Sequence, residues 1–409
     1  MVSAKHNLRH LPFFESLAAH GEHDAAWRSA TAGLVVLRLV DAWLEDTADV
    51  MKPDTWGVKA VEAAIERVDD GTPIKTILRG IMDAMKASKN RSARVVTPRM
   101  MAYAKALEYD AKWAMAADVY DTIIGHTHPV QESDTAIVAH LQSAVCLRTL
   151  GRFDEAQVAY ATAGAIAEQA GDMLGVLRAR IGDAKIAVAR GNLPRAEALL
   201  DETISAATLH GVRTAHSMAL HDRATVAGMQ GKYELTIQLA YDALRESTVP
   251  IDRDRILNDI GMAFHMLGIR SAARDAFLVL SVTATEQYMR WLATLGLMTI
   301  AAEDHSQPVF EQLQRTLRTA SLPPQLETEY YLRLGLAYRE FEEEDLCEIA
   351  LAKAVKLAES YGFNQLLFEA ESALASKPAP RPKVTAYIPN EIEPVVEAMR
   401  SMRELVPVR

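Results

Sequence analysis

The chain has 409 residues and a formal net charge of −10, with 44 Lys and Arg against 54 Asp and Glu. Hydrophobic residues make up 49% of it and aromatic residues only 6%, which favours packed helices over a β-sandwich or a barrel. The acidic balance argues against nucleic-acid binding, because that activity relies on cationic surface to neutralise phosphates.

The two cysteines, Cys146 and Cys347, are too few for a disulfide framework or a cysteine metal cluster. We expect both to be small buried residues in a reducing compartment. The first residues lack the apolar core of a signal peptide. The most apolar early stretch, 32–44, contains Arg38 and Asp41 and is too short and too charged to span a membrane. We therefore expect a cytoplasmic protein that does not bind membranes.

The N-terminal quarter of the chain is predicted to be helical. We expect residues 1–22 to form an arm and residues 23–96 to form a helical cap or a divergent repeat. Apolar periodicity predicts one long helix over 23–45. Thr72 followed by Pro73 has the residue types that start a helix. The polar and basic segment 86–96 is predicted to be a loop.

One short sequence pattern recurs along the middle of the chain. Similarity at a fixed period of this kind indicates a repeat architecture. The pattern begins with a glycine each time, and the four glycines are 40, 40 and 37 residues apart. Stepping back 40 residues from the first reaches Ala111. Stepping on by 37 from the last reaches His305 and Glu342. The four glycines are Gly151, Gly191, Gly231 and Gly268.

Small and large residues follow these turn positions at fixed offsets. A further glycine precedes some of the turn positions. Gly261 stands seven residues before Gly268, and Gly335 seven before Glu342. Small residues allow two helices to cross closely, and a large residue one turn later fills the adjacent groove. The clearest sets are Ala156, Tyr160 and Ala163; Ala273, Phe277 and Leu280; and Cys347, Leu351 and Ala354.

This pattern resembles the tetratricopeptide repeat (TPR), and the match covers roughly residues 97–375. The resemblance implies an all-α fold: a right-handed superhelical solenoid of antiparallel helix pairs, with about seven units over 97–376. Units of 37–40 residues are longer than the usual ~34 and imply longer helices, as in the TPR-like arrays of bacterial regulators. The unit over 286–320 is degenerate, with Pro308 where we expect the small residue of its second helix.

The end of the chain is predicted to contain three further segments. A helix over 363–375 would cover the last repeat. Residues 377–388 read as a proline-rich linker. Residues 389–409 carry apolar side chains at helical spacing and are predicted to form an amphipathic helix. That helix could dock in the protein's own groove or on a second subunit, or remain a frayed tail.

No residue pattern indicates chemistry. The closest histidine pairs, including His126 and His128, lack metal-site spacing, and no cysteine pair supports them. The sequence contains no phosphate-binding glycine motif and no nucleophile elbow. We therefore expect no catalytic residues, no metal, no cofactor and no enzyme activity.

In a TPR array the concave groove is lined mainly by the first helix of each pair. The resemblance lets groove-facing positions be assigned by their distance from the turn. Some of these positions hold apolar residues: Leu141, Ile181, Met262 and Leu332. The polar residues that we expect to bind a partner are Lys105, Gln142, Arg178, Lys185, His221, Arg255, Asn258, Asp259 and Arg333.

Three functions fit these expectations. The first is a non-enzymatic scaffold or adaptor that binds a peptide or protein segment in its groove. The second is a peptide- or ligand-sensing regulator, because an N-terminal helical module followed by TPR units resembles the layout of Rap-type receptors. The third is a structural homo-oligomer, for example a homodimer assembled through the N-terminal helices or the C-terminal helix.

Overall fold

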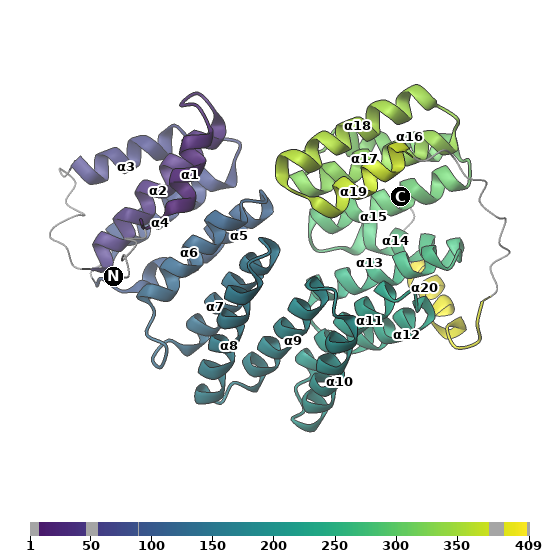
Figure 1. The fold of residues 1–409 in the computed structure, drawn as a ribbon, viewed down its shortest axis with the longest axis horizontal. Helices are drawn as coiled ribbons and strands as arrows, with labels where there is room; N and C mark the ends of the chain where they lie inside the picture. The colour runs from purple at the N-terminus through teal and green to yellow at the C-terminus, as the bar shows by residue number, and fades with distance from the viewer. Residues whose placement is uncertain (1–7, 46–55, 89, 376–387, 407–409) are drawn as a thin grey trace, which may run out of the picture. The chain divides into compact units, whose positions relative to one another are not determined.

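The computed structural model describes residues 8–45, 56–88, 90–375 and 388–406, and all regular secondary structure in these ranges is helical (Figure 1). The chain divides into two compact units, residues 1–186 and 187–409, which we describe separately. None of the described helices is long and apolar enough to cross a membrane.

Unit 1 begins with four helices that precede the repeats. Helix α1 packs on α2 and α6, with Phe13 fully buried. From α5 onward the helices form antiparallel pairs of a first helix (A) and a second helix (B). The helices of unit 1 are α1 (Leu11–Ala19), α2 (Ala25–Leu44), α3 (Trp56–Glu66), α4 (Pro73–Ala87), α5 (Ala93–Tyr109), α6 (Trp113–His126), α7 (Ser133–Thr149) and α8 (Phe153–Ala170).

The pairs continue into unit 2. Helix α9 (Met173–Ala189) contains the boundary between the units. The remaining helices are α10 (Leu193–Leu209), α11 (Arg213–Met229), α12 (Tyr233–Glu246), α13 (Pro250–Met266), α14 (Arg270–Thr283), α15 (Gln287–Glu303), α16 (Gln307–Arg318), α17 (Pro324–Glu340), α18 (Glu344–Tyr361), α19 (Asn364–Ala375) and α20 (Glu393–Glu404).

The turn between the A and B helices of a pair lies where the recurring glycine pattern predicts it. The four glycines have left-handed backbone, with φ between 73° and 75°. The same conformation occurs at Ala111, His305 and Glu342, with φ of 58°, 50° and 62°. This backbone is costly for residues other than glycine, so the fold imposes it at the three positions. Gly71, 40 residues before Ala111, does not share it.

The difference between 40- and 37-residue intervals lies outside the A helices. Helices α7, α9, α11, α13, α15 and α17 each have 17 residues. The B helices vary: α8 has 18 residues, whereas α12 and α14 have 14. The array therefore keeps its first helices constant and adjusts its period in the second helices and the loops that follow them.

Glycines on the A helices contact large residues of the B helices, as the predicted small–large pattern requires. A Cβ atom built on Gly261 of α13 would lie 2.8 Å from the Phe277 ring of α14. One built on Gly296 of α15 would lie 2.7 Å from the same ring. Gly335 approaches Leu351 in the same way. These helices touch because no side chain separates them, which confirms TPR-like packing.

Several local expectations were wrong or need correction. The predicted loop 86–96 is much shorter, because α4 ends at Ala87 and α5 begins at Ala93, with Pro98 inside the helix. Pro308 does not occupy the small position of its unit, because it lies in the first turn of α16, where proline is favoured. Buried Phe310 occupies that position instead. Part of the expected arm is helix α1.

Other expectations concern the cysteines and the end of the chain. Cys146 and Cys347 are both free and buried. Helix α19 follows the last pair, close to the range predicted for a covering helix. The predicted linker lies outside the described residues except for its last position. Helix α20 packs on α14 and α12, which are B helices (Figure 1), and not on the A helices that line the predicted groove.

Candidate functional site

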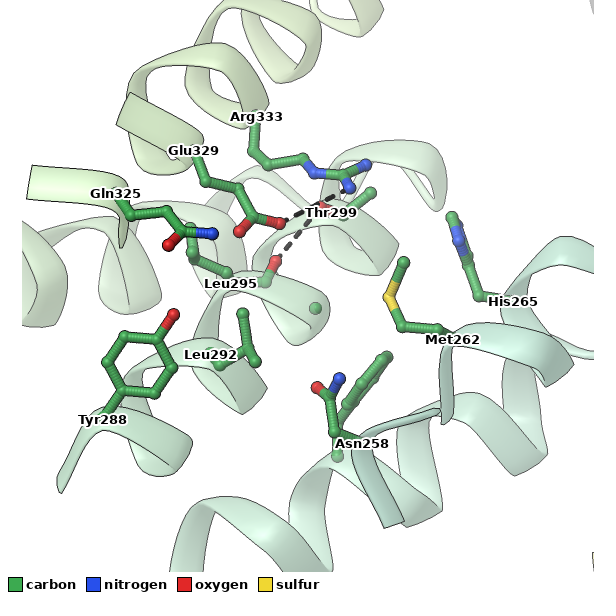
Figure 2. Close-up of a pocket in the computed structure, with 12 residues that line it drawn as sticks. Asn258, Met262, His265, Tyr288, Leu292, Leu295, Thr299, Gln325, Glu329 and Arg333 are labelled. Carbon is green, nitrogen blue, oxygen red and sulfur yellow. Dashed lines mark hydrogen bonds and ion pairs between the residues drawn. The ribbon is translucent and has the colours of Figure 1, made fainter. Parts of the chain in front are cut away.

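A pocket of about 260 Å³ lies on the A-helix side of unit 2, and we call it the A-face pocket. Helices α13, α15 and α17 each contribute side chains three or four residues apart, so each presents one helical face to it. Figure 2 shows α13 residues on one side and α17 residues on the other. The lining residues are Asn258, Met262, His265, Phe277, Tyr288, Leu292, Leu295, Gly296, Thr299, Gln325, Glu329 and Arg333.

The floor of the pocket is apolar and fixed. The Phe277 ring is 1% exposed and lies between Gly261 and Gly296, so it is held on two sides. Leu295 is buried beside it, and Leu292 is half-buried. Because the tight glycine contacts leave the ring little room, the floor is preorganised to receive an apolar group.

A carboxylate and a guanidinium face the pocket from α17. The Arg333 guanidinium lies 3.6 Å from the Glu329 carboxylate, and both side chains are about a quarter exposed (Figure 2). Burial raises the pKa of the Glu329 carboxyl, and Arg333 only partly offsets the effect. A loose pair of this kind leaves Arg333 N–H groups available to an incoming acceptor.

The α13 side of the pocket contains an unsatisfied amide. Asn258 donates through Nδ2 to Asp259 at 3.2 Å, but its buried Oδ1 has no hydrogen-bond partner among the described residues. A buried acceptor without a partner costs about 1–3 kcal/mol. A donor from a ligand would remove that cost. Further along α13, His265 is already engaged by Glu303 at 2.9 Å.

Two of the five predicted binding residues of unit 2 line the A-face pocket, and three do not. Asn258 and Arg333 line the A-face pocket from opposite sides (Figure 2). Next to Asn258, Asp259 accepts a 2.8 Å hydrogen bond from His221. Arg255 is exposed and lies 3.8 Å from Asp252, outside the pocket lining.

The predicted residues of unit 1 are not gathered in one pocket. Lys105 donates to Gln142 at 2.6 Å and to Glu108 at 2.8 Å, so two of the expected residues contact each other. Arg178 and Lys185 are both half-buried on α9. Neither lines the pocket of α1, α2 and α6 or the pocket of α6, α7 and α8 in unit 1.

The apolar positions assigned to the groove were mostly wrong. Leu141, Ile181 and Leu332 are 3% exposed or less and belong to the core. They fail because the assigned offset lies at the edge of the buried stripe of each A helix, where a leucine or isoleucine turns inward. Met262 is the exception and lines the A-face pocket.

The sequence reasoning missed most of the pocket lining, including the polar residues His265, Tyr288, Thr299, Gln325 and Glu329. A signal existed for two of them, because Gln325 and Glu329 precede Arg333 at four-residue steps on one helical face. Tyr288 lies near the start of α15, in the repeat with the weakest pattern, so its register gave no guidance.

A second polar pocket, of about 370 Å³, lies in unit 1 between α1, α2 and α6. At its centre Asp41 accepts hydrogen bonds from His10 at 3.3 Å, His126 at 2.9 Å and Arg9 at 3.1 Å. His10 also donates to Asp118 at 2.7 Å. We call these five residues the Asp41 cluster. Its members hold α1 on the rest of the unit.

The Asp41 cluster perturbs the pKa of two of its members. Burial lowers the pKa of His10, but hydrogen bonds to Asp118 and Asp41 outweigh it and raise the pKa to about 9. Burial raises the pKa of Asp41, and the two histidines outweigh it and hold that pKa well below its usual range. Within the described residues no group of histidine, cysteine or acidic side chains is arranged to hold a metal ion.

No protein-family model matches this chain, and no curated protein matches it. Solved structures do match. A Rap conjugation gene regulator of plasmid pLS20, in complex with the Phr* peptide, aligns with a TM-score of 0.50 and 12% identity. The alignment covers 85% of this chain and 99% of that one.

Two further structures are similar. A Rap protein complexed with Competence and Sporulation Factor has a TM-score of 0.51 and 11% identity, over 82% of this chain and 98% of that one. The apo quorum sensor NprR from B. thuringiensis has a TM-score of 0.45 and 11% identity, over 84% and 91%. At these identities the two Rap matches establish the fold alone: a TPR-like helical solenoid.

Proposed function

We propose that this chain is a non-enzymatic scaffold that holds an extended peptide, or an extended segment of a larger protein, with the A-face pocket as its anchor site. The observation that carries the proposal is the buried, unpartnered Oδ1 of Asn258, opposite the loosely paired Arg333 and above an apolar floor. An unpaired acceptor and available donors match the N–H and C=O groups of an extended backbone.

The size of the pocket defines which part of the ligand it takes. At about 260 Å³ it is smaller than most pockets for drug-sized ligands, which occupy ~300–1,000 Å³. It suits one apolar side chain of a longer ligand, with Asn258 contacting the adjacent backbone. Arg333 suits a carboxylate, either an acidic side chain or a C-terminus.

The test is selection from a random peptide library with the purified full-length chain. We expect enriched peptides to combine an apolar residue with a carboxylate. The double variant Asn258→Ala, Arg333→Met should bind them at least about tenfold more weakly, since each lost contact is worth about 1 kcal/mol. Arg213→Glu, an exposed site on α11, is the matched control. Equal binding by both variants would remove the pocket from the proposal.

A ligand-sensing regulator is the second candidate. It is favoured by the printed names of the two similar Rap structures, which were solved with a peptide and with a Competence and Sporulation Factor. Co-purification from the native host followed by mass spectrometry separates the two. A stable protein partner supports the scaffold, and a bound short peptide supports the regulator. Light scattering tests the third candidate, a homo-oligomer.

We further propose a cytoplasmic location. The two free, buried cysteines fit a reducing compartment. Fractionation of cells that express the native protein checks it.

A further inference from the structure

Helix α20 is a short amphipathic helix that covers the B-helix side of unit 2. Its buried residues Ile392, Val395 and Met399 are at most 4% exposed and share one apolar cluster with residues of α12 and α14. Met402 and Val406 extend the same stripe and are partly buried. Spacings of three and four residues place Val395, Met399 and Met402 on one face of the helix, and Ile392 and Val406 flank its two ends.

The position of α20 is not that of a further repeat. Helix α19 packs on α18 and α17 at the end of the array. Helix α20, the next helix that the structure describes, lies on α14 and α12, several helices back along the chain (Figure 1). The B helices of the array already pack on their own A helices. Helix α20 therefore packs on the outside of complete helix pairs and belongs to none of them.

The same type of groove exists without such a cover in unit 1. There, α6 and α8 are successive B helices, and with α7 they line a pocket of about 550 Å³. Its apolar lining includes Ile124, Leu147 and Val158, the last of which is 66% exposed. The stacking of neighbouring B helices therefore creates an apolar groove. In unit 2, α20 fills such a groove.

The charge pairing between α20 and its groove is incomplete. Arg403 Nε lies 3.8 Å from the carboxylate of Asp275 on α14, which is longer than a hydrogen bond. The Asp275 side chain is 17% exposed. Burial raises its pKa, and Arg403 and Arg400 only partly offset the effect. A helix with a better-placed basic residue would pair with this carboxylate more fully.

We propose that the surface of α12 and α14 is a docking site for an amphipathic helix of another protein, and that α20 occupies it as a tethered competitor. The helix that it fits carries apolar residues at the spacing of Ile392, Val395 and Met399. It also carries a basic residue near its C-terminal end that faces Asp275. This site is separate from the A-face pocket and does not depend on the function proposed for that pocket.

The tether decides how strongly α20 competes. Covalent linkage gives a linked helix an effective concentration on the order of 1 mM. If α20 itself has a Kd of about 10 μM for the surface, a free helix would bind the intact chain about 100-fold more weakly than the open surface. For the same reason a second copy of the chain does not displace α20 at micromolar concentration.

The experiment uses the full chain and a fluorescent synthetic peptide of residues 389–406 as the probe. Met399→Asp in the chain places a charge in the buried stripe and releases α20 without removing it. We expect this variant to bind the peptide about 100-fold more tightly than the natural chain does. Ser401→Asp, which adds the same charge at an exposed position of α20, should bind like the natural chain.

Two additional arms make the result decisive. Val395→Asp should open the surface as Met399→Asp does, so the test does not rest on one variant, and circular dichroism verifies that each remains helical. A peptide with Arg403→Glu should bind a few-fold more weakly, and Asp275→Lys in the opened chain should restore it. The proposal is overturned if the opened, folded chains bind no peptide, or if the natural chain binds it equally well.

Discussion

The two polar clusters of this chain differ in how completely their groups satisfy one another. In the Asp41 cluster of unit 1, one carboxylate accepts hydrogen bonds from three side chains at 2.9–3.3 Å, and His10 pairs on both ring nitrogens. In the A-face pocket of unit 2, Arg333 and Glu329 are 3.6 Å apart and Asn258 keeps an unpaired buried acceptor.

This difference separates a structural role from a binding role. A carboxylate that already accepts three hydrogen bonds offers little to a ligand, and the bonds of this network hold α1 on α2 and α6. A pocket with an unmatched acceptor, a loosely held guanidinium and an apolar floor gains from a ligand what it lacks on its own. The comparison predicts that substitutions in unit 1 change stability and that substitutions in the A-face pocket change binding.

The largest effect is expected for Asp41→Ala. It leaves His10 and Arg9 without their shared carboxylate, and breaking a buried pair costs about 3–5 kcal/mol. Glu45→Ala is the control, because Glu45 is 42% exposed and its ion pair, with Arg9 at 2.6 Å, lies at the surface. Urea unfolding followed by circular dichroism measures both. Equal losses of stability would contradict the role given to the cluster.

A pH effect of somewhat smaller size should come from His10. Its folded pKa of about 9 exceeds the ordinary 6.5, so its contribution is complete below pH 6.5 and is lost as the pH rises through 9. The shift corresponds to about 3 kcal/mol, and thermal unfolding should fall in temperature across that window. His10→Gln should flatten the profile. A natural chain with a flat profile would refute the pairing.

In the A-face pocket, Arg333→Met alone should leave the free energy of unfolding within about 0.5 kcal/mol, since its pair with Glu329 is partly exposed. It should nevertheless weaken binding of library-selected peptides about tenfold, a loss of 1.4 kcal/mol. Denaturation and fluorescence anisotropy on one preparation measure the two quantities. A large loss of stability without a loss of binding would mean that Arg333 has a structural role and not a binding role.

The smallest effect is expected for a substitution outside both polar clusters, and it serves as a baseline. Glu342 holds a left-handed turn with φ of 62°, a conformation that costs an ordinary residue about 1–2 kcal/mol. Glu342→Gly removes this cost but adds entropy to the unfolded chain, so we expect a net gain of about 0.5–1 kcal/mol. Chemical denaturation shows it, and peptide binding should not change. A loss of stability would mean that the turn is not strained.

The sequence contained much of the fold because the repeat carries its own register. Counting 37 or 40 residues from a glycine reached the left-handed turns at Ala111, His305 and Glu342, although none of these is a glycine. The tight approach of Gly261 to Phe277 follows from the same offsets. Local geometry of this kind repeats, so one clear unit predicts the others.

The two polar clusters were harder to predict from the sequence, for a physical reason. His10 contacts Asp118 across 108 positions and Asp41 across 31, and no period links such residues. Asn258 and Arg333 were reached by their distance from the turn, but the pocket also needs Tyr288, from a repeat whose pattern is weak. A site that draws on four helices is defined by their packing, and the pattern of a single helix does not specify it.

The most direct test of the binding role is a methyl NMR titration of the full chain with 13C-labelled methionine. Met262 lines the A-face pocket, whereas Met399 belongs to α20 and is buried against the B helices. On addition of a library-selected peptide, we predict that the Met262 signal shifts and the Met399 signal does not. An unchanged Met262 signal at saturating peptide would contradict the account.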